Sequence, residues 1–190
     1  MSMVGLFFGS FNPIHNGHLT IARYLLKYRY CEEVWFVVSP QNPWKKDQTL
    51  LEEEKRLQIV QSAIAEDSRM KASDVEFYMP RPSYTSQTLQ LLKRRFPETG
   101  FSLIIGGDNL QRFHYWQNYE EILKDFPLFV YPRRGYPIPK LDAGHIVLIN
   151  APLSDISSTA IREKIEKNED ISTYVPASAL ALIQEYYGSR

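Results

Sequence analysis

The sequence contains almost no cysteine, no excess of charge of either sign and no long apolar segment. Its one cysteine, Cys31, cannot form an intramolecular disulfide or a cysteine-based zinc site, and this favours a reducing, cytoplasmic environment. Lysine and arginine number 22, as do aspartate and glutamate, so the zero net charge argues against a nucleic-acid partner. The apolar runs fall far short of the roughly 18 residues that a membrane helix needs, and the N-terminus lacks a signal-peptide pattern. We therefore expect a globular protein without a nucleic-acid or membrane partner, and the sequence leaves its oligomeric state open.

Short apolar segments alternate with helix-forming segments along the chain. Strands are predicted at residues 4–8, 34–39, 70–77, 101–105, 128–131 and 146–149, and helices at 17–30, 50–65, 85–95, 116–124, 158–167 and 177–187. The strands are continuously apolar, which is typical of parallel strands covered on both faces. The pattern predicts one α/β domain over residues 1–190, with a mostly parallel sheet between two layers of helices.

The segment between the first predicted strand and the first predicted helix has the features of a phosphate site. Gly9 ends the strand and lets a ligand approach the main chain, and the helix that follows offers free N–H groups and a positive dipole end. His15 and His18 are three residues apart, which directs both imidazoles at one ligand. Two donors at one anion suit phosphoryl transfer, which depends on positioning and charge stabilisation. No third ligand lies near at metal-binding spacing, so we expect no protein metal site.

A second candidate phosphate site lies just before the helix predicted at 158–167. Ser157 and Ser158 are suited to cap that helix and to donate hydroxyl hydrogen bonds to phosphate. Arg162, about one turn further on, is placed to add a charge-assisted bond to the same anion. Taken alone, the segment is better explained as an ordinary capped helix.

Residues 8–19, FGSFNPIHNGHL, resemble the H-x-G-H signature of the nucleotidyltransferase superfamily, and ISSTAIR at 156–162 is similar to its second signature. The resemblance implies a Rossmann-like, doubly wound fold and the transfer of AMP or CMP from a nucleoside triphosphate to a phosphate-bearing acceptor. It implies catalytic roles for His15, His18 and Arg162, and Mg²⁺ bound to the triphosphate and mostly to water. The implied ATP site consists of Gly9, Ser10, Phe11, His15, Gly17, His18, Ser157, Ser158 and Arg162.

Three further segments are similar to one branch of that superfamily, the bacterial nicotinate-nucleotide adenylyltransferases. They are PSYTSQTL at 82–89, IGGDNL at 105–110 and the downstream Trp116, and the resemblance extends from Val4 to about Tyr186. It implies that ATP and nicotinate mononucleotide are the substrates, that the SYT loop and Trp116 hold the nicotinate ring and that Asp108 lies near the ribose. The implied acceptor site consists of Lys45, Ser83, Tyr84, Thr85, Gly106, Asp108 and Trp116.

The sequence departs from this branch at one loop. Pro43-Trp44-Lys45 stands where the branch usually has Pro-His-Lys, so the lysine is retained for phosphate contact and the histidine is not. Asn12 and Ser10 replace the commoner Asp and Thr of the phosphate loop. The alternatives that stay open are another small adenylyltransferase, acting on nicotinamide mononucleotide or phosphopantetheine, and a non-catalytic nucleotide sensor on the same fold.

Overall fold

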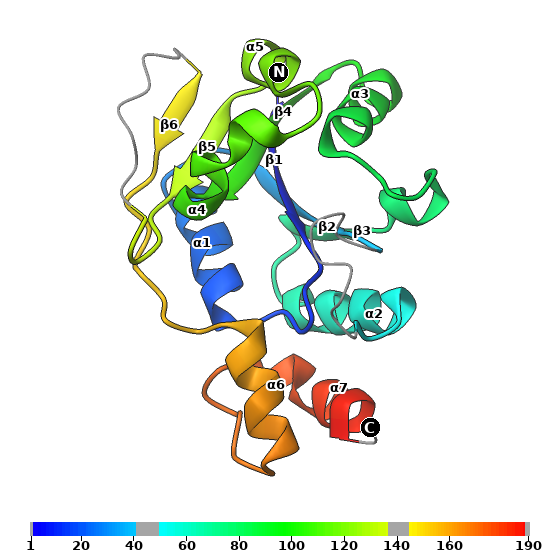
Figure 1. Cartoon of the computed structure of the whole chain (residues 1–190), viewed down its shortest axis with the longest axis vertical. Helices are drawn as coiled ribbons and strands as arrows, with labels where there is room; N and C mark the ends of the chain where they lie inside the picture. The colour runs from blue at the N-terminus through cyan, green and yellow to red at the C-terminus, as the bar shows by residue number, and fades with distance from the viewer. Residues whose placement is uncertain (1, 41–49, 137–144, 189–190) are drawn as a thin grey trace.

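Six parallel strands form one sheet in the order β3-β2-β1-β4-β5-β6 in the computed structural model, which describes residues 2–40, 50–136 and 145–188 (Figure 1). The strands are β1 (Ser2–Gly9), β2 (Glu33–Val38), β3 (Met70–Ser73), β4 (Thr99–Gly106), β5 (Leu128–Tyr131) and β6 (Ile146–Leu148). The helices are α1 (Asn16–Lys27), α2 (Glu53–Ile64), α3 (Thr85–Arg95), α4 (Gly107–Gln111), α5 (Tyr119–Asp125), α6 (Ser158–Glu166) and α7 (Ala177–Gly188). All five strand pairings are parallel, so the predicted α/β fold class is confirmed.

Successive side chains of the central strands point to opposite faces of the sheet, and each face has its own core. Phe7 of β1 and Ile104 of β4 pack in the cluster that contains the apolar sides of α1, α2, α6 and α7. Leu6 and Leu103, their neighbours in sequence, pack in the cluster formed with α3, α4 and α5. Because both faces are covered, the central strands are mostly apolar, and the buried hydroxyl of Ser102 in β4 donates to the carbonyl of Val4.

The direction of the strand order reverses between β1 and β4. The chain runs outward from β1 through β2 to β3, then returns to place β4 on the other side of β1 and continues to β5 and β6. In such sheets a crevice opens at the carboxyl ends of the strands where the order reverses. Here those ends are Gly9 of β1 and Gly106 of β4, which places the loop after β1 and the start of α4 beside that crevice.

Two predicted boundaries shift because of buried polar contacts. β3 ends at Ser73 and not at 77, and the chain then forms a short 3₁₀ helix at Val75–Tyr78 that buries Glu76. The second helix begins at Glu53, three residues later than predicted. Leu51 precedes it outside the helix, where its N–H donates to Asn12 Oδ1 (3.2 Å) and its carbonyl accepts from Arg56 (2.7 Å).

Two other boundaries are set by left-handed residues, which a right-handed helix cannot include. The first helix ends at Lys27 and not at 30, and Arg29 has a φ of 58°. The helix predicted at 116–124 begins only at Tyr119, because Asn118 has a φ of 55°. Between β4 and Asn118, the chain forms α4 and then the short 3₁₀ helix Phe113–Tyr115.

We expect the centre of the sheet to dominate the stability of the fold. Leu103→Ala in β4 removes a fully buried side chain and should lower the free energy of unfolding by about 2–5 kcal/mol. Leu148→Ala in β6 is the matched control, since Leu148 is 52% exposed. This variant should lower the free energy of unfolding by less than about 1 kcal/mol. Urea unfolding of both variants measures the difference, and equal losses would contradict this account of the core.

Candidate active site

The loop after β1 starts with a glycine whose missing side chain makes room for an aromatic ring. A Cβ on Gly9 would lie 2.9 Å from Cζ of Phe11, which is buried and has a positive φ of 44°. The Phe11 ring in turn contacts the edges or faces of Phe7 and His18, with ring centroids 5.9 Å and 5.1 Å apart. The side chain of Phe11 is therefore part of the core beneath His18. Only the main chain of this residue is in a position to contact ATP.

His15 and His18 lie together at the N-terminus of α1. Their rings stack with centroids 3.7 Å apart and an interplanar angle of 27°. The backbone N–H of His15, the N-cap residue, donates to Nδ1 of His18 (3.2 Å). Since Nδ1 of His18 accepts, the neutral His18 ring carries its proton on Nε2 and can donate that proton to a ligand.

Both imidazoles are neutral at physiological pH. Burial, aided by the positive charge of Arg133, lowers the pKa of His15 from 6.5 to about 3. Burial also lowers the pKa of His18 well below its usual value, and the neighbouring His15 and Arg133 add to the effect. The pair therefore supplies hydrogen-bond donors and not permanent positive charge, so other groups must provide the charge for an anion.

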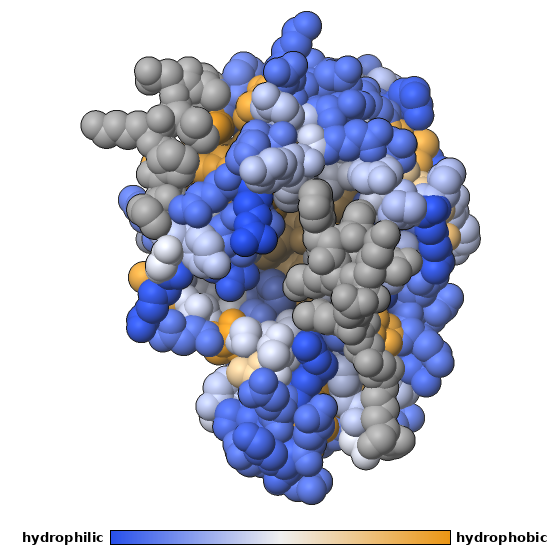
Figure 2. All heavy atoms as spheres, in the orientation of Figure 1, coloured by the Kyte–Doolittle hydropathy of each residue, from blue (hydrophilic) through white to orange (hydrophobic). Residues whose placement is uncertain are grey.

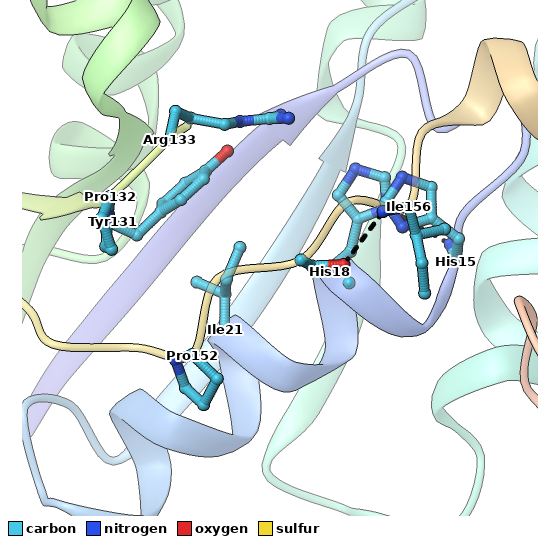
Figure 3. Close-up of a pocket in the computed structure, with 10 residues that line it drawn as sticks. His15, His18, Ile21, Tyr131, Pro132, Arg133, Pro152 and Ile156 are labelled. Atoms are coloured by element: carbon cyan, nitrogen blue, oxygen red, sulfur yellow. Dashed lines mark hydrogen bonds between the residues drawn. The ribbon is translucent and has the colours of Figure 1, made fainter. Parts of the chain in front are cut away.

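A cleft of about 320 Å³, open to solvent, extends from the histidines to the end of β5. Figure 3 shows the two histidines at one end of this cleft and Tyr131 and Arg133 at the other. The guanidinium of Arg133 lies 5.6 Å from the centroid of the Tyr131 ring, and its Nε lies 3.7 Å from Oδ1 of Asp108. In the view of Figure 2, a hollow with a hydrophilic rim lies in the middle of the molecule.

Arg133 was not among the predicted site residues. It follows β5 directly, at the carboxyl edge of the sheet where ligands bind in this class of fold. The sequence signal was available in the pair Arg133-Arg134 at the end of a predicted strand, in a long loop of the kind that carries function.

The second predicted phosphate segment does cap a helix, and it also meets the loop after β1. Ser157 is the N-cap of α6, and its Oγ accepts from the N–H of Ala160 (3.1 Å). Ser158 Oγ donates to the carbonyl of Pro13 (2.8 Å), and Arg162 donates to the carbonyl of Asn12 (2.7 Å). The two motifs, separated by about 140 residues in sequence, therefore contact each other. The hydroxyl hydrogen of Ser158 is bound to the carbonyl of Pro13, whereas the hydroxyl of Ser157 accepts and keeps its own hydrogen for donation.

Asn12 and Gly17 complete the joint between these segments. Asn12 is buried, and its Oδ1 accepts from the hydroxyl of Tyr187 in α7 (2.6 Å) in addition to Leu51. A neutral amide meets these donors without burying the negative charge that an aspartate would carry. A Cβ on Gly17 would lie 2.8 Å from Oγ of Ser154, so a glycine is needed where the segment before α6 packs on α1.

The predicted acceptor residues after β4 lie next to the cleft. Asp108 belongs to the first turn of α4, and its Oδ1 lies where a Cβ on residue 106 would clash with it, which explains Gly106. The ion pair of Asp108 with Arg133 connects this turn to the wall formed at the end of β5. The position is compatible with contact to a ligand that extends from the histidines toward α4.

The remaining predicted acceptor residues differ in their exposure and in their hydrogen-bond partners. Tyr84 is the partly exposed N-cap of α3 and Thr85 is its first residue, so the N–H groups of this turn have no acceptor within the helix. Ser83 is different, because it is buried and its hydroxyl donates to Glu76 (3.0 Å). Trp116 is half-buried against Phe113, with ring centroids 5.1 Å apart. Lys45 and Trp44 lie outside the described residues.

In residues 2–40, 50–136 and 145–188, no group of three or more His, Cys, Asp or Glu side chains is arranged to hold a metal ion. None of the helices in this part of the chain is long and apolar enough to span a bilayer.

Comparison with known proteins places these features in a family. The family described as cytidylyltransferase-like matches residues 6–164, which include both phosphate segments. The chain is thus a nucleotidyltransferase of that class by fold and by site. A protein of Cytophaga hutchinsonii is 44% identical over 98% of both chains, and one of Bacteroides thetaiotaomicron is 43% identical over 96% of this chain and 91% of its own. Both are named "Probable nicotinate-nucleotide adenylyltransferase", and the chain belongs to the family of nicotinate-nucleotide adenylyltransferases.

Solved structures support the same fold. The nicotinic acid mononucleotide adenylyltransferase of Plasmodium falciparum, solved in a complex with NaAD, superimposes with a TM-score of 0.83. The comparison covers 98% of this chain and 96% of that one at 21% sequence identity. The arrangement of the sheet and helices is therefore shared by a protein that differs at most positions.

We expect His15 to remain neutral in the folded protein far into the acid range. Its pKa is about 3 when folded, whereas an unfolded histidine titrates near 6.5, so acid protonates the unfolded chain first. The stability that depends on the neutral ring is fully present above about pH 6.5 and is lost as the pH falls toward 3. Nitrogen NMR of the ring should show the neutral form down to about pH 5, while the same ring in denaturant titrates near 6.5.

The variant His15→Gln provides the control for this pH dependence. It removes the titrating group, so its melting temperature should fall less than that of the wild type between about pH 7 and pH 5. A folded His15 ring that protonates near pH 6.5 would contradict the assignment of a buried neutral pair.

Proposed function

We propose that the protein transfers AMP from ATP to nicotinate mononucleotide, forming nicotinate adenine dinucleotide and pyrophosphate for NAD synthesis. The observation that carries the proposal is the meeting of the histidine pair with the N-terminus of α6 at the carboxyl edge of the sheet, where Arg162 contacts the loop after β1. The names of the relatives at 43% and 44% identity support the choice of acceptor.

The triphosphate lies along the N-terminal ends of α1 and α6 in this proposal. An oxygen of the acceptor phosphate attacks the α-phosphorus of ATP, the bond from that phosphorus to the bridging oxygen breaks, and pyrophosphate leaves. Nε2–H of His18 donates to the α-phosphate, where charge develops, and Arg162 and Arg133 offset the charge of the remaining phosphates. The acceptor phosphate is already ionised, so the reaction needs alignment and charge stabilisation and no general base.

The acceptor extends from the cleft toward α3 and α4. The N–H groups at Tyr84 and Thr85 face the nicotinate carboxylate at the positive end of the α3 dipole, and Trp116 stacks on the pyridine ring. Asp108 takes the ribose hydroxyls and Lys45 takes the acceptor phosphate, as the family resemblance implies. Together with the triphosphate site, these residues place the two substrates in line across the switch point of the sheet.

Mg²⁺ accompanies ATP in this proposal and reduces the repulsion between the two anionic substrates. The phosphates and water would hold such an ion, because Mg²⁺ keeps most of its water ligands when it binds a nucleotide. The whole of residues 1–190 acts as one domain, and the cytoplasm is the expected compartment, on the same grounds of length and cysteine content as before.

The acceptor pocket predicts a preference for the acid over the amide of the pyridine ring. A carboxylate accepts from every N–H group at the start of α3, whereas a carboxamide turns its NH₂ toward one of them and leaves a donor unpaired. Such a mismatch costs roughly 1–3 kcal/mol, which corresponds to about two decades in kcat/KM. Initial rates of pyrophosphate release with Mg-ATP and either mononucleotide should therefore favour nicotinate mononucleotide about 100-fold.

The same assay separates the remaining alternatives. A preference for the amide would contradict the assignment of the α3 loop and leave adenylyl transfer standing. Turnover with phosphopantetheine alone would replace the acceptor, and ATP binding without pyrophosphate release from any acceptor would identify a nucleotide sensor.

Arg162 offers a direct test of the triphosphate site. Arg162→Lys retains the charge but loses the planar fork that can contact Asn12 and phosphate oxygens together. We expect KM for ATP to rise about tenfold and KM for the acceptor to change little. Arg69→Lys, in an exposed pair with Asp67, is the matched control and should leave both values unchanged. Equal effects of Arg162→Lys on both substrates would indicate a purely structural arginine.

A further inference from the structure

A buried carboxylate lies beneath the predicted acceptor loop. Glu76 is only 2% exposed, and both of its oxygens accept hydrogen bonds. Ser83, next to the proposed ring-binding residues, donates at 3.0 Å, and Thr88 of α3 donates at 2.8 Å. The side chain of Ser39, just after β2, is a third hydroxyl partner of the same carboxylate. Glu76 therefore connects the start of α3 to the end of β2.

A buried cation lies on the other side of Ser39. Arg56 of α2 is 1% exposed, and its guanidinium donates to the carbonyl of Ser39 at 2.9 Å and to the carbonyl of Ser10 in the loop after β1. Further bonds reach the carbonyls of Leu51 (2.7 Å) and Pro40 (3.1 Å). These four partners are all main-chain oxygens, so the guanidinium connects the segments to which they belong.

Ser39 is the residue that both charged groups share. Its hydroxyl bonds Glu76, its carbonyl accepts from Arg56, and its N–H donates to the carbonyl of Gly9 (2.9 Å). A continuous chain of buried and half-buried contacts thus runs from Ser83, just before α3, to Ser10 in the loop after β1. The two loops are otherwise separate segments on different faces of the sheet, because α1 and α3 belong to different core clusters.

We propose that Glu76, Ser39 and Arg56 form a positioning network that fixes the acceptor loop relative to the phosphate loop. The inference rests on the proposed function, in which the phosphate loop holds the triphosphate of ATP and the acceptor loop holds the pyridine ring of the acceptor. In-line transfer depends on alignment, and a displacement of about 1 Å can reduce the rate 100-fold without weakening either substrate's binding. None of the three side chains needs to touch a substrate, so their effect is on kcat and not on affinity.

Two buried groups of opposite charge contribute little net free energy to the stability of a fold, because both lose their hydration. Burial raises the pKa of Glu76 and lowers that of Arg56, which shows that each group loses hydration. Apolar side chains of similar size would fill the same space without this loss. Polar groups in these positions specify direction, because each hydrogen bond holds one loop atom at one place.

The test compares two serines with a hydroxyl inside the fold. Ser39→Ala removes only the hydroxyl of the half-buried Ser39, which links Glu76 to the end of β2. The control is Ser102→Ala, which removes a fully buried hydroxyl that donates to the carbonyl of Val4 in the amino-terminal half of β1. Ser39→Thr retains a hydroxyl and tests for rescue.

We expect Ser39→Ala to lower kcat about 10- to 100-fold while KM for each substrate changes less than about threefold. Ser102→Ala should stay within about twofold of wild type, and Ser39→Thr should recover most of the rate. A fall in kcat for Ser39→Ala of less than about fivefold relative to Ser102→Ala, or a loss that appears only in KM, overturns the proposal. Rates are compared below the melting temperature of each variant.

A readout that does not depend on activity separates this proposal from the proposed function. Ser39→Ala should accelerate amide hydrogen exchange in both residues 10–14 and residues 83–88, whereas Ser102→Ala should accelerate it in neither. If the wild type releases no pyrophosphate, the proposed function fails, and exchange alone decides the network. Acceleration in one loop only, or in neither, shows that the two loops are not linked and overturns it.

Discussion

The hydrogen bonds from α6 to the loop after β1 are the interaction on which the candidate site depends. Arg162 and Ser158 donate to the consecutive carbonyls of Asn12 and Pro13, so the start of α6 is hydrogen-bonded to the main chain of the first motif. The first motif brings the histidines to the crevice of the sheet, and the second brings a helix N-terminus and an arginine. Without these hydrogen bonds, each motif is only the start of a helix. The sequence of the second motif, considered alone, likewise predicts no more than a capped helix.

The distribution of charge around this joint is uneven although the chain as a whole is neutral. The histidines are held neutral at the base of the cleft, while Arg133 stands opposite and Arg56 lies buried behind the loop. Neutral donors bind an anion moderately in the ground state and respond to charge as it develops, which favours the transition state over the bound substrate. The arginines raise the local potential without requiring a basic protein surface.

The sequence predicted the parallel sheet and the order of the elements, because both depend on local patterns of apolar and capping residues. A single site made of the two phosphate motifs was implied only by the family resemblance. The sequence did not reveal which polar residues face inward. The ring of Phe11 lies in the core, and the hydroxyl of Ser83 donates to the buried Glu76. Local sequence does not reveal such burial, because segments far away in sequence produce it. Arg133 was missed for a related reason, since the pair Arg133-Arg134 after a predicted strand is a weak signal and only the fold shows that Arg133 lies across the cleft from His15. The predicted ends of two helices were wrong because a residue with a left-handed backbone conformation lies at each of them.

The bond between Asn12 and Tyr187 has a consequence for the order in which the protein acquires its site. Its two partners are 175 positions apart, and α7 packs on α2 in the same core as α1. During synthesis, which proceeds at about 5–20 residues per second, the early strands can pair while the phosphate loop still lacks this contact. This contact is therefore completed late, after residue 187 has left the ribosome, and a shorter nascent chain contains the first motif without it.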